Sequence, residues 1–331
     1  MEFSNKSTDN VLLIDGPSLT RILATHSALF FETASKAPSV ICCRCLPTQK
    51  AMITERIKKI SKKTVAAIGD GGNDVGMIQI SSIGIGIVGK EGNHAALASD
   101  ISILEFKYVK NLILWHGRNS YKRAAALSQF VIHRGLIISI LQMAFSIIFY
   151  NVAIPIYNGM LMLGYATLYT SLPVFSIIFD EDVTLEKTML YPNLYITLRK
   201  SRDLNTKTFF IWLWISIYQG VVIMVLSLVL FEQSFVRIVT ITFTSLIISE
   251  ILNVATTIHR LNKWIVGSQV LTLLIYALSL IFLNNYIDTS KIDKDFLWKV
   301  FAIVAVSWTP IHLAKCIIRR ISPTEEDRIT N

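Results

Sequence analysis

Six long apolar stretches after residue 135 limit what this chain can fold into. They cover residues 136–157, 161–179, 209–231, 235–258, 264–283 and 296–318. Each has roughly the 20 residues that an α-helix needs to cross a hydrocarbon core of about 30 Å. Hydrophobic residues make up 52% of the chain and charged residues only 17%, which excludes a disordered chain and an ordinary soluble enzyme. We therefore predict a membrane domain of six helices within residues 116–331.

The basic residues of the connectors lie mainly on one side of these spans. The formal net charge is +9. Lys291 and Lys294 are the basic residues of one set of connectors, whereas the other set has fourteen: Arg118, Lys122, Arg123, Arg134, Lys187, Arg199, Lys200, Arg202, Lys207, Arg260, Lys263, Arg319, Arg320 and Arg328. Such a bias marks the cytosolic side, so we predict a multi-pass protein with both termini in the cytosol. Because no basic patch is interleaved with aromatic residues, we expect no nucleic-acid partner.

Residues 1–115 alternate between short apolar runs and helical segments. The runs are 11–15 (VLLID), 40–45 (VICCRC) and 64–68 (TVAAI). Continuous apolar runs are typical of parallel strands that are buried on both faces, so we predict part of a doubly wound α/β domain with three to five strands. Its three cysteines, Cys42, Cys43 and Cys45, lack the paired spacing of a zinc site, and we interpret them as reduced thiols in a buried strand.

The segment GDGGND, residues 69–74, directly follows the third run. Ligands bind at the carboxyl ends of parallel strands, where glycines let backbone amides approach a phosphate. Asp70 and Asp74, with Asn73 between them, supply the oxygen ligands that Mg²⁺ prefers. Lys50, one strand–helix unit earlier, supplies a point charge for phosphoryl oxygens. We therefore predict a magnesium and phosphoryl site.

The sequence resembles the C-terminal part of P4-type ATPases, the phospholipid flippases. The resemblance rests on five motifs in order: RCLPTQK (44–50), AIGDGGNDVGMIQ (67–79), IGIGIVGKEG (83–92), ASD (98–100) and HGRNSYKR (116–123). Three further motifs are similar to the Neo1-like, or class 2, subgroup: HRGLIIS (133–139), GYATLYTSLPVFS (164–176) and MLYPNLY (189–195).

The resemblance implies the following domains and roles. Residues 1–115 would be the C-terminal part of a cytosolic phosphorylation domain of the haloacid dehalogenase type, and residues 116–331 would hold helices M5–M10. Asp70 and Asp74 would hold Mg²⁺, Lys50 and Asn73 would contact the transferred phosphoryl group, and Arg44 would belong to the ATP site. In the implied reaction cycle, ATP would phosphorylate an aspartate, the acyl phosphate would be hydrolysed, and a phospholipid would move across the membrane. The favoured substrate would be an aminophospholipid, and the membranes would be those of the Golgi or endosomes. A Cdc50-type accessory subunit would not be required.

Two motifs of that family, DKTGT with the nucleophilic aspartate and TGES, do not occur in these residues. We therefore expect this chain to be a fragment of a longer transporter or a truncated gene model, inactive without the missing N-terminal part. Two alternatives stay open. One is a membrane-anchored phosphohydrolase of the haloacid dehalogenase class, for which Asp15 is the candidate nucleophile. The other is a non-catalytic truncated partner of a full-length pump.

Three residues within or next to the spans are candidates for a lipid path. Arg134, followed by Gly135, stands where other flippases carry a lysine–asparagine pair, and it keeps the positive charge as a planar guanidinium. Thr170 matches the family pattern in the second span. Glu250 lies within a span, where an ionised carboxylate costs free energy unless it is paired or faces a water-filled cavity, so it is a candidate functional residue. A polar contact between helices is an equal alternative to a functional role. We expect the acidic run Asp180–Asp182 to form a solvated loop.

Overall fold

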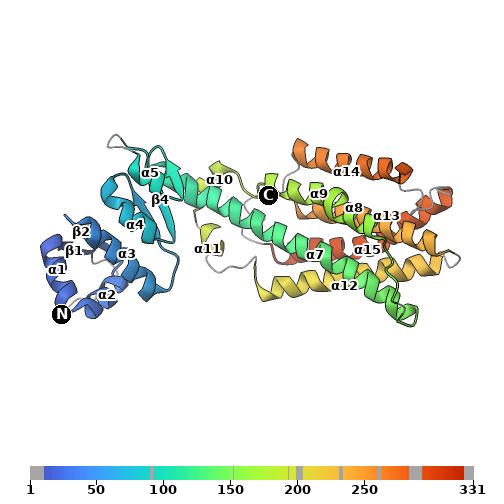
Figure 1. Cartoon of the computed structure of the whole chain (residues 1–331), viewed down its shortest axis with the longest axis horizontal. Helices are drawn as coiled ribbons and strands as arrows, with labels where there is room; N and C mark the ends of the chain where they lie inside the picture. The colour runs from blue at the N-terminus through green and yellow to red at the C-terminus, as the bar shows by residue number, and fades with distance from the viewer. Residues whose placement is uncertain are drawn as a thin grey trace. The chain divides into compact units, whose positions relative to one another are not determined.

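The computed structural model describes residues 11–89, 93–151, 153–192, 194–198, 204–230, 234–258, 262–282 and 293–323. The chain divides into two compact units, one ending at Leu112 and the other beginning at Ile113, and each is described by itself (Figure 1). Several residues that entered the predictions lie outside the described ranges: Val152, Arg199, Lys200, Arg202, Phe231, Arg260, Leu283, Lys291 and Arg328.

The first unit begins with a parallel pair of strands. Strands β1 (Val11–Asp15) and β2 (Ser39–Cys43) pair in the register Val11–Ser39 to Asp15–Cys43. Two helices, α1 (Gly16–Thr25) and α2 (Ser27–Lys36), connect them, and α3 (Pro47–Ser61) follows. The buried side chain of Gln49 donates to the carbonyl of Gly16 at 3.1 Å and to the hydroxyl of Thr20 at 2.8 Å, which fixes α3 against α1.

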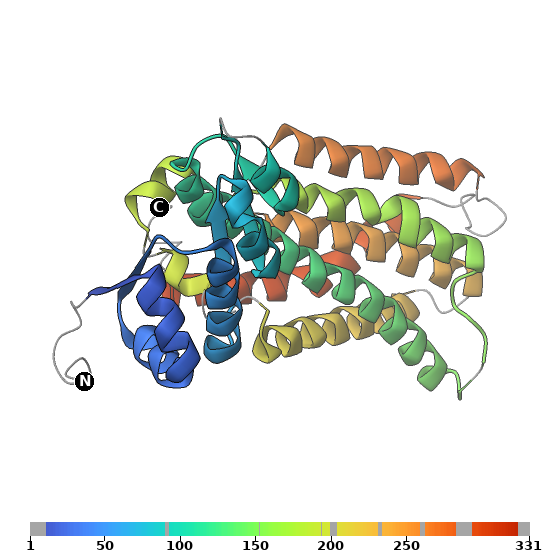
Figure 2. The ribbon, with the colours of Figure 1, turned by 60° about the vertical axis from the view of Figure 1, so that its left-hand side comes forward.

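A second parallel sheet has the order β3–β4–β5 (Figure 2). Its strands are β3 (Ala66–Gly69), β4 (Ile83–Ile87) and β5 (Ile101–Ile103), and the helices between them are α4 (Val75–Ile80) and α5 (His94–Ala98). A Cβ atom on Gly86 would lie 2.6 Å from the carbonyl oxygen of Ala95. The glycine in this strand therefore lets α5 pack directly on β4.

The strands of the first pair are not buried on both faces, contrary to the sequence prediction. Ile14 is buried, whereas 67% of Leu13 and 49% of Ile41 is exposed. Cys43 is exposed as well, so the expected buried cysteine strand is wrong at that position. The reason is that the described helices cover the face of β1 that carries Ile14 and leave the face that carries Leu13 uncovered.

The second unit has six helices that are long and apolar enough to cross a membrane, which agrees with the predicted number for the described residues. After α7 (Arg118–Ile148), the second is Gly159–Phe179, built from α8 (Gly159–Gly164), η4 (Tyr165–Tyr169), α9 (Ser171–Ser176) and η5 (Ile177–Phe179). The others are α12 (Thr206–Leu230), α13 (Phe235–Thr257), α14 (Lys263–Phe282) and α15 (Lys294–Ile321). Two short helices, α10 (Leu185–Leu190) and α11 (Leu194–Leu198), lie in the connector before α12. These helices make the chain a multi-pass membrane protein.

The first membrane helix ends earlier than the predicted span 136–157. Helix α7 stops at Ile148, and after Phe149 the residues Tyr150 and Asn151 have φ angles of 57° and 60°, which a right-handed helix does not allow. Residues 153–155 then form a segment without regular secondary structure. The Gln142 side chain binds both sides of it, accepting from the amide of Ile156 at 2.9 Å and donating to the carbonyl of Ile154 at 3.0 Å.

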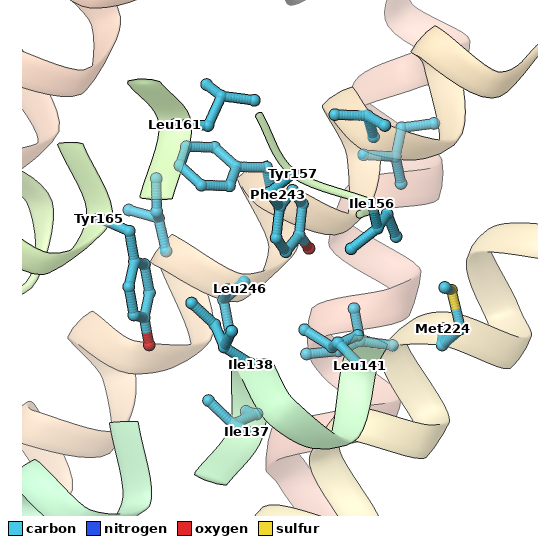
Figure 3. Close-up of a cluster of buried hydrophobic side chains, with 14 of the residues drawn as sticks. Ile137, Ile138, Leu141, Ile156, Tyr157, Leu161, Tyr165, Met224, Phe243 and Leu246 are labelled. Carbon is cyan, nitrogen blue, oxygen red and sulfur yellow. The ribbon is translucent and has the colours of Figure 1, made fainter. Parts of the chain in front are cut away.

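The core of this unit contains buried residues from all six membrane spans. Figure 3 shows Leu141 of α7 next to Met224 of α12, and Ile138 of α7 next to Leu246 of α13. Phe243 is fully buried, and its ring packs edge-on against those of Tyr157 and Tyr169. Burial of a residue such as Phe or Leu contributes about 1.5–3 kcal/mol in a water-soluble protein, but between lipid-facing helices the gain comes mainly from close packing.

Candidate functional site

Lys50 and Asp74 form the centre of the predicted phosphoryl site. Lys50 lies in the first turn of α3, and Asp74 ends the short helix η2 (Gly72–Asp74) that follows β3. The ammonium of Lys50 lies 2.7 Å from a carboxylate oxygen of Asp74. Asp74 is buried, and about a third of the Lys50 side chain is exposed. The structure thus brings together two of the predicted residues that are 24 positions apart in sequence.

The backbone at the end of β3 is shaped to admit Asp74. A Cβ atom on Gly69 would lie 2.3 Å from the Cβ of Asp74, a distance that side chains do not adopt. The amide of Asp74 in turn donates to the carbonyl of Gly71 at 3.0 Å, which closes the turn. Glycine at position 69 is therefore what lets the chain fold the carboxylate back over the strand end.

Asp70 and Asn73 lie in the same turn and are exposed. Mg²⁺ is commonly bound by one or two carboxylates together with phosphate oxygens and water, so two carboxylates in one turn beside a lysine are a suitable set of donors. No group of three or more His, Cys, Asp or Glu side chains that could hold a metal ion occurs among the described residues. A magnesium ion here would accordingly take its further ligands from outside these side chains, such as water and the oxygens of a bound phosphoryl group.

Arg44 and Asp15 lie at the carboxyl ends of the other sheet. Arg44 directly follows β2, is exposed, and has a φ of 53°. Asp15 ends β1 and caps α1, because its carboxylate accepts the amide of Ser18 at 3.2 Å. Hydrogen bonds from the Ser18 side chain and backbone hold the pKa of Asp15 below its usual value of 3.8.

Arg134 and Thr170, two of the predicted lipid-path residues, are in direct contact within the membrane unit. One guanidinium nitrogen of Arg134 lies 3.0 Å from the Thr170 hydroxyl and 3.4 Å from the Ser171 hydroxyl. The span is irregular before α9, at the π-helix η4 and the turn at Thr170, and the hydroxyls of Thr170 and Ser171 donate to the carbonyls of Tyr165 and Ala166. Such side chains satisfy backbone groups that an interrupted membrane helix leaves open.

Glu250 belongs to a buried polar cluster that sequence reasoning only partly found. Its carboxyl lies 3.4 Å from the Tyr165 hydroxyl and 3.7 Å from His133 Nε2. The cluster continues through Asn253, which contacts His133 at 3.2 Å and exchanges two hydrogen bonds with Gln219. The missed members, His133 and Asn253, could have been found as further polar residues next to or within apolar spans, which is the signal that identified Glu250.

The acidic run after the second span is not the solvated loop that the sequence suggested. Asp182 is 8% exposed and accepts a hydrogen bond of 2.8 Å from the buried guanidinium of Arg118. Lys122 lies 3.6 Å from the same carboxylate, and Arg123 donates to the carbonyl of Asp180 at 2.6 Å. The basic start of α7 supplies the charges that hold this run in place.

Comparison with known proteins supplies the class to which these features belong. The family model described as "Phospholipid-translocating P-type ATPase C-terminal" matches residues 96–324. The "Probable phospholipid-transporting ATPase IIB" of Danio rerio is 50% identical over 324 residues, covering 98% of this chain and 29% of that protein. Two more relatives are the "Probable phospholipid-transporting ATPase tat-5" of Caenorhabditis elegans and the "Phospholipid-transporting ATPase NEO1" of Saccharomyces cerevisiae. They are 45% and 44% identical, over 96% and 98% of this chain and 30% and 28% of their own lengths.

The chain belongs to the family of phospholipid-translocating P-type ATPases. Its similarity to the tat-5 and NEO1 proteins agrees with the Neo1-like subgroup that the sequence motifs indicate. The chain spans about 29% of the length of the first of these relatives.

Proposed function

We propose that this chain is the C-terminal part of an ATP-driven phospholipid translocase, and that the turn at residues 69–74 together with Lys50 is its phosphoryl-handling site. The observation that carries the proposal is the 2.7 Å contact between Lys50 and Asp74 at the carboxyl end of β3. It places a cation and a carboxylate at the edge of a parallel sheet where such folds bind phosphates. In this reading residues 1–115 are part of a haloacid-dehalogenase-like phosphorylation domain.

The proposed chemistry requires little covalent work from these residues. Phosphoryl transfer is accelerated mainly by positioning and by neutralising the charge on the phosphoryl oxygens. Asp70 and Asp74 would hold Mg²⁺, which neutralises part of that charge. Lys50 and Asn73 would contact the phosphoryl oxygens, and Arg44 would contact ATP. The nucleophile would be an aspartate of the full-length protein outside these 331 residues, since DKTGT does not occur in them.

The strand pairing supports a contribution from the rest of the protein. Among the described strands, β1 pairs only with β2, and β3 pairs only with β4. Each of these strands therefore keeps an edge whose backbone groups can pair with a further strand. We propose that the preceding part of the full-length protein supplies it, and without that part this chain is inactive.

In the membrane, the six helices would correspond to M5–M10, with both ends of the chain in the cytosol. Arg134, Thr170 and Glu250 would line the path of a phospholipid headgroup, and an aminophospholipid is our proposed substrate. The guanidinium of Arg134 suits a phosphate because it presents several donors in a plane. Golgi or endosomal membranes and independence from a Cdc50-type subunit are proposed from the resemblance of the motifs at 133–139, 164–176 and 189–195 to the Neo1-like subgroup.

Phosphoenzyme formation by the full-length protein tests this proposal. Purified protein is given labelled ATP and Mg²⁺, and the acid-stable phosphoprotein is counted for wild type, Lys50→Ala and Lys59→Ala. Lys59 is a matched control because it lies on the same helix and pairs only with the exposed Glu55 among its described contacts. We expect Lys50→Ala to lower the rate by about 10²–10³, the usual effect of removing one charge-stabilising group, and Lys59→Ala to leave it unchanged. Equal rates in both variants contradict the proposal.

The size of the protein in cells separates the translocase from the non-catalytic truncated partner. An immunoblot of host membranes that shows a band several times heavier than 37.3 kDa supports the translocase, whereas a stable band at 37.3 kDa alone favours the non-catalytic partner. For the phosphohydrolase, the capping of α1 by Asp15 offers a structural role for its candidate nucleophile.

A further inference from the structure

The Glu250 carboxyl is buried in the membrane unit, and few hydrogen-bond donors surround it among the described residues. Glu250 is 2% exposed, and no described group donates a hydrogen bond to its second carboxyl oxygen, Oε2. An ionised carboxylate in this position needs several donors or a paired cation. The described contacts of Oε1 are the Tyr165 hydroxyl at 3.4 Å and His133 Nε2 at 3.7 Å.

The Tyr165 hydroxyl has one hydrogen and two oxygen neighbours. It lies 3.1 Å from the backbone carbonyl of Arg134 and 3.4 Å from Glu250. The carbonyl can only accept, so the tyrosine hydrogen belongs to the shorter contact. The contact with Glu250 then becomes a hydrogen bond only if the carboxyl carries a proton and donates it to the tyrosine oxygen.

Hydrogen counting at His133 gives the same result. The Ser216 hydroxyl donates to the carbonyl of Trp212 at 2.8 Å, so at its 2.7 Å contact with His133 Nδ1 the imidazole is the donor. The other nitrogen, Nε2, accepts from the amide of Asn253 in a neutral ring. A carboxylate 3.7 Å from this lone pair would be repelled, whereas a protonated carboxyl is not.

The charged groups around Glu250 are few. From α7, Arg134 lies nearby, but its guanidinium is directed to Thr170 and makes no described ion pair with Glu250. From α15, Lys315 lies over the Trp212 ring, which in turn packs against His133, so a positive charge disfavours protonation of the imidazole. The α12 neighbours Ser216 and Gln219 are uncharged.

We propose that Glu250 is a proton-binding site within the membrane. Glu250 and His133 together hold one proton at net charge zero, and in this conformation the proton lies on Glu250 and is donated to Tyr165. Glu250 is thereby a positioning residue, because the chain from Glu250 through Tyr165 to the Arg134 carbonyl links α13 and η4 to the turn of α7 that carries Arg134. The importance of Glu250 for transport rests on the proposed function, whereas the presence of a proton on Glu250 does not rest on it.

Infrared spectroscopy of the full-length protein in lipid nanodiscs tests the proton directly. We expect the spectrum of wild type minus Glu250→Gln to contain the carbonyl band of a protonated carboxyl, at neutral pH. Glu186→Gln is the control, because Glu186 is exposed and its removal takes away only carboxylate bands. In Tyr165→Phe the carbonyl band of the protonated carboxyl should persist, at the frequency of a carboxyl that has lost its hydrogen-bond acceptor. A difference spectrum for Glu250→Gln that contains only carboxylate bands overturns the proposal.

Transport supplies the second readout. A Gln side chain can donate to Tyr165 as a protonated carboxyl does, whereas Ala cannot, so Glu250→Gln should lose less of the transport rate than Glu250→Ala. If Glu250→Gln abolishes transport while the protein stays folded and phosphorylates normally, the positioning role is wrong. Failure of the wild type to transport any phospholipid, with the infrared band present, contradicts the proposed function and leaves the proton site standing.

Discussion

The guanidinium of Arg118 lies 2.8 Å from the carboxylate of Asp182, and the two side chains are 1% and 4% exposed. The same guanidinium donates to the carbonyl of Leu194 at 2.9 Å. Residues that are 64 and 76 positions apart in sequence are thus fixed around one buried cation. The pair joins the first turn of α7 to the connector that follows the second membrane span.

Breaking this buried pair should destabilise the membrane unit strongly. Removal of one partner leaves the other charge buried, which typically costs about 3–5 kcal/mol. We therefore expect Asp182→Ala to lower the midpoint of thermal unfolding of the detergent-solubilised protein clearly. Glu181→Ala is the matched control, since Glu181 is partly exposed and 3.9 Å from Arg123. Equal midpoints for the two variants would show that the Asp182 pair contributes no more than a surface contact.

Gly69→Ala should disturb the phosphoryl site, and Gly72→Ala should not. The new methyl group at position 69 would meet Asp74 at 2.3 Å, whereas nothing lies within 4 Å of a Cβ at position 72. We expect a loss of about 1–3 kcal/mol in stability from such overpacking, together with slower phosphorylation. The measurement is denaturant unfolding and phosphoenzyme formation for both variants. A normal phosphorylation rate in Gly69→Ala speaks against the close approach of Asp74 to β3.

The cap of α1 should depend on pH. Hydrogen bonds from Ser18 hold the pKa of Asp15 below 3.8, so Asp15 binds its proton more weakly in the folded state than in the unfolded state. The cap consequently stabilises the helix above the unfolded pKa, and this contribution disappears as the pH falls through the lower, folded value. Hydrogen exchange at the Ser18 amide should be slow in wild type and Asp15→Asn, which still caps, and fast in Asp15→Ala. Equally slow exchange in Asp15→Ala would mean that the cap protects nothing.

Arg134→Ala should weaken phospholipid transport without preventing phosphorylation by ATP. The guanidinium contacts Thr170 and Ser171 and is proposed to meet the lipid phosphate. A charge-assisted hydrogen bond contributes roughly 1.5–3 kcal/mol, so the lipid concentration for half-maximal transport should rise by about 10-fold to 150-fold. The control is Ser139→Ala, in which the lost hydroxyl bonds only to its own helix among the described contacts. An unchanged half-maximal concentration removes Arg134 from the lipid path.

The sequence was most informative where one physical requirement dominates. The membrane spans follow from apolar length, and the last four helices begin and end within a few residues of the predicted ranges. The prediction of the first span was wrong at its C-terminal end. Residues 149–157 are mostly apolar and suit a membrane interior, but the positive φ angles of Tyr150 and Asn151 form a turn there. Hydropathy does not register φ angles.

Contacts between distant residues were harder to predict. The link between Lys50 and Asp74 could be expected, since both follow strands of parallel sheets and their charges are complementary. Asp182 could not be assigned to Arg118, because a run of three acids has the same composition whether it is solvated or paired. The cluster of His133, Gln219, Glu250 and Asn253 depends on which faces of three helices meet, and single spans carry weak periodicity when nearly every residue is apolar.

Transport across reconstituted membranes measures whether Asp74 serves an ATP-driven phospholipid pump. The full-length protein is placed in proteoliposomes with a fluorescent aminophospholipid, and ATP-dependent movement between leaflets is followed for wild type, Asp74→Asn and the exposed control Glu55→Gln. We expect ATP- and Mg²⁺-dependent transport in wild type and Glu55→Gln, and its loss in Asp74→Asn. Transport by Asp74→Asn at the wild-type rate would contradict it.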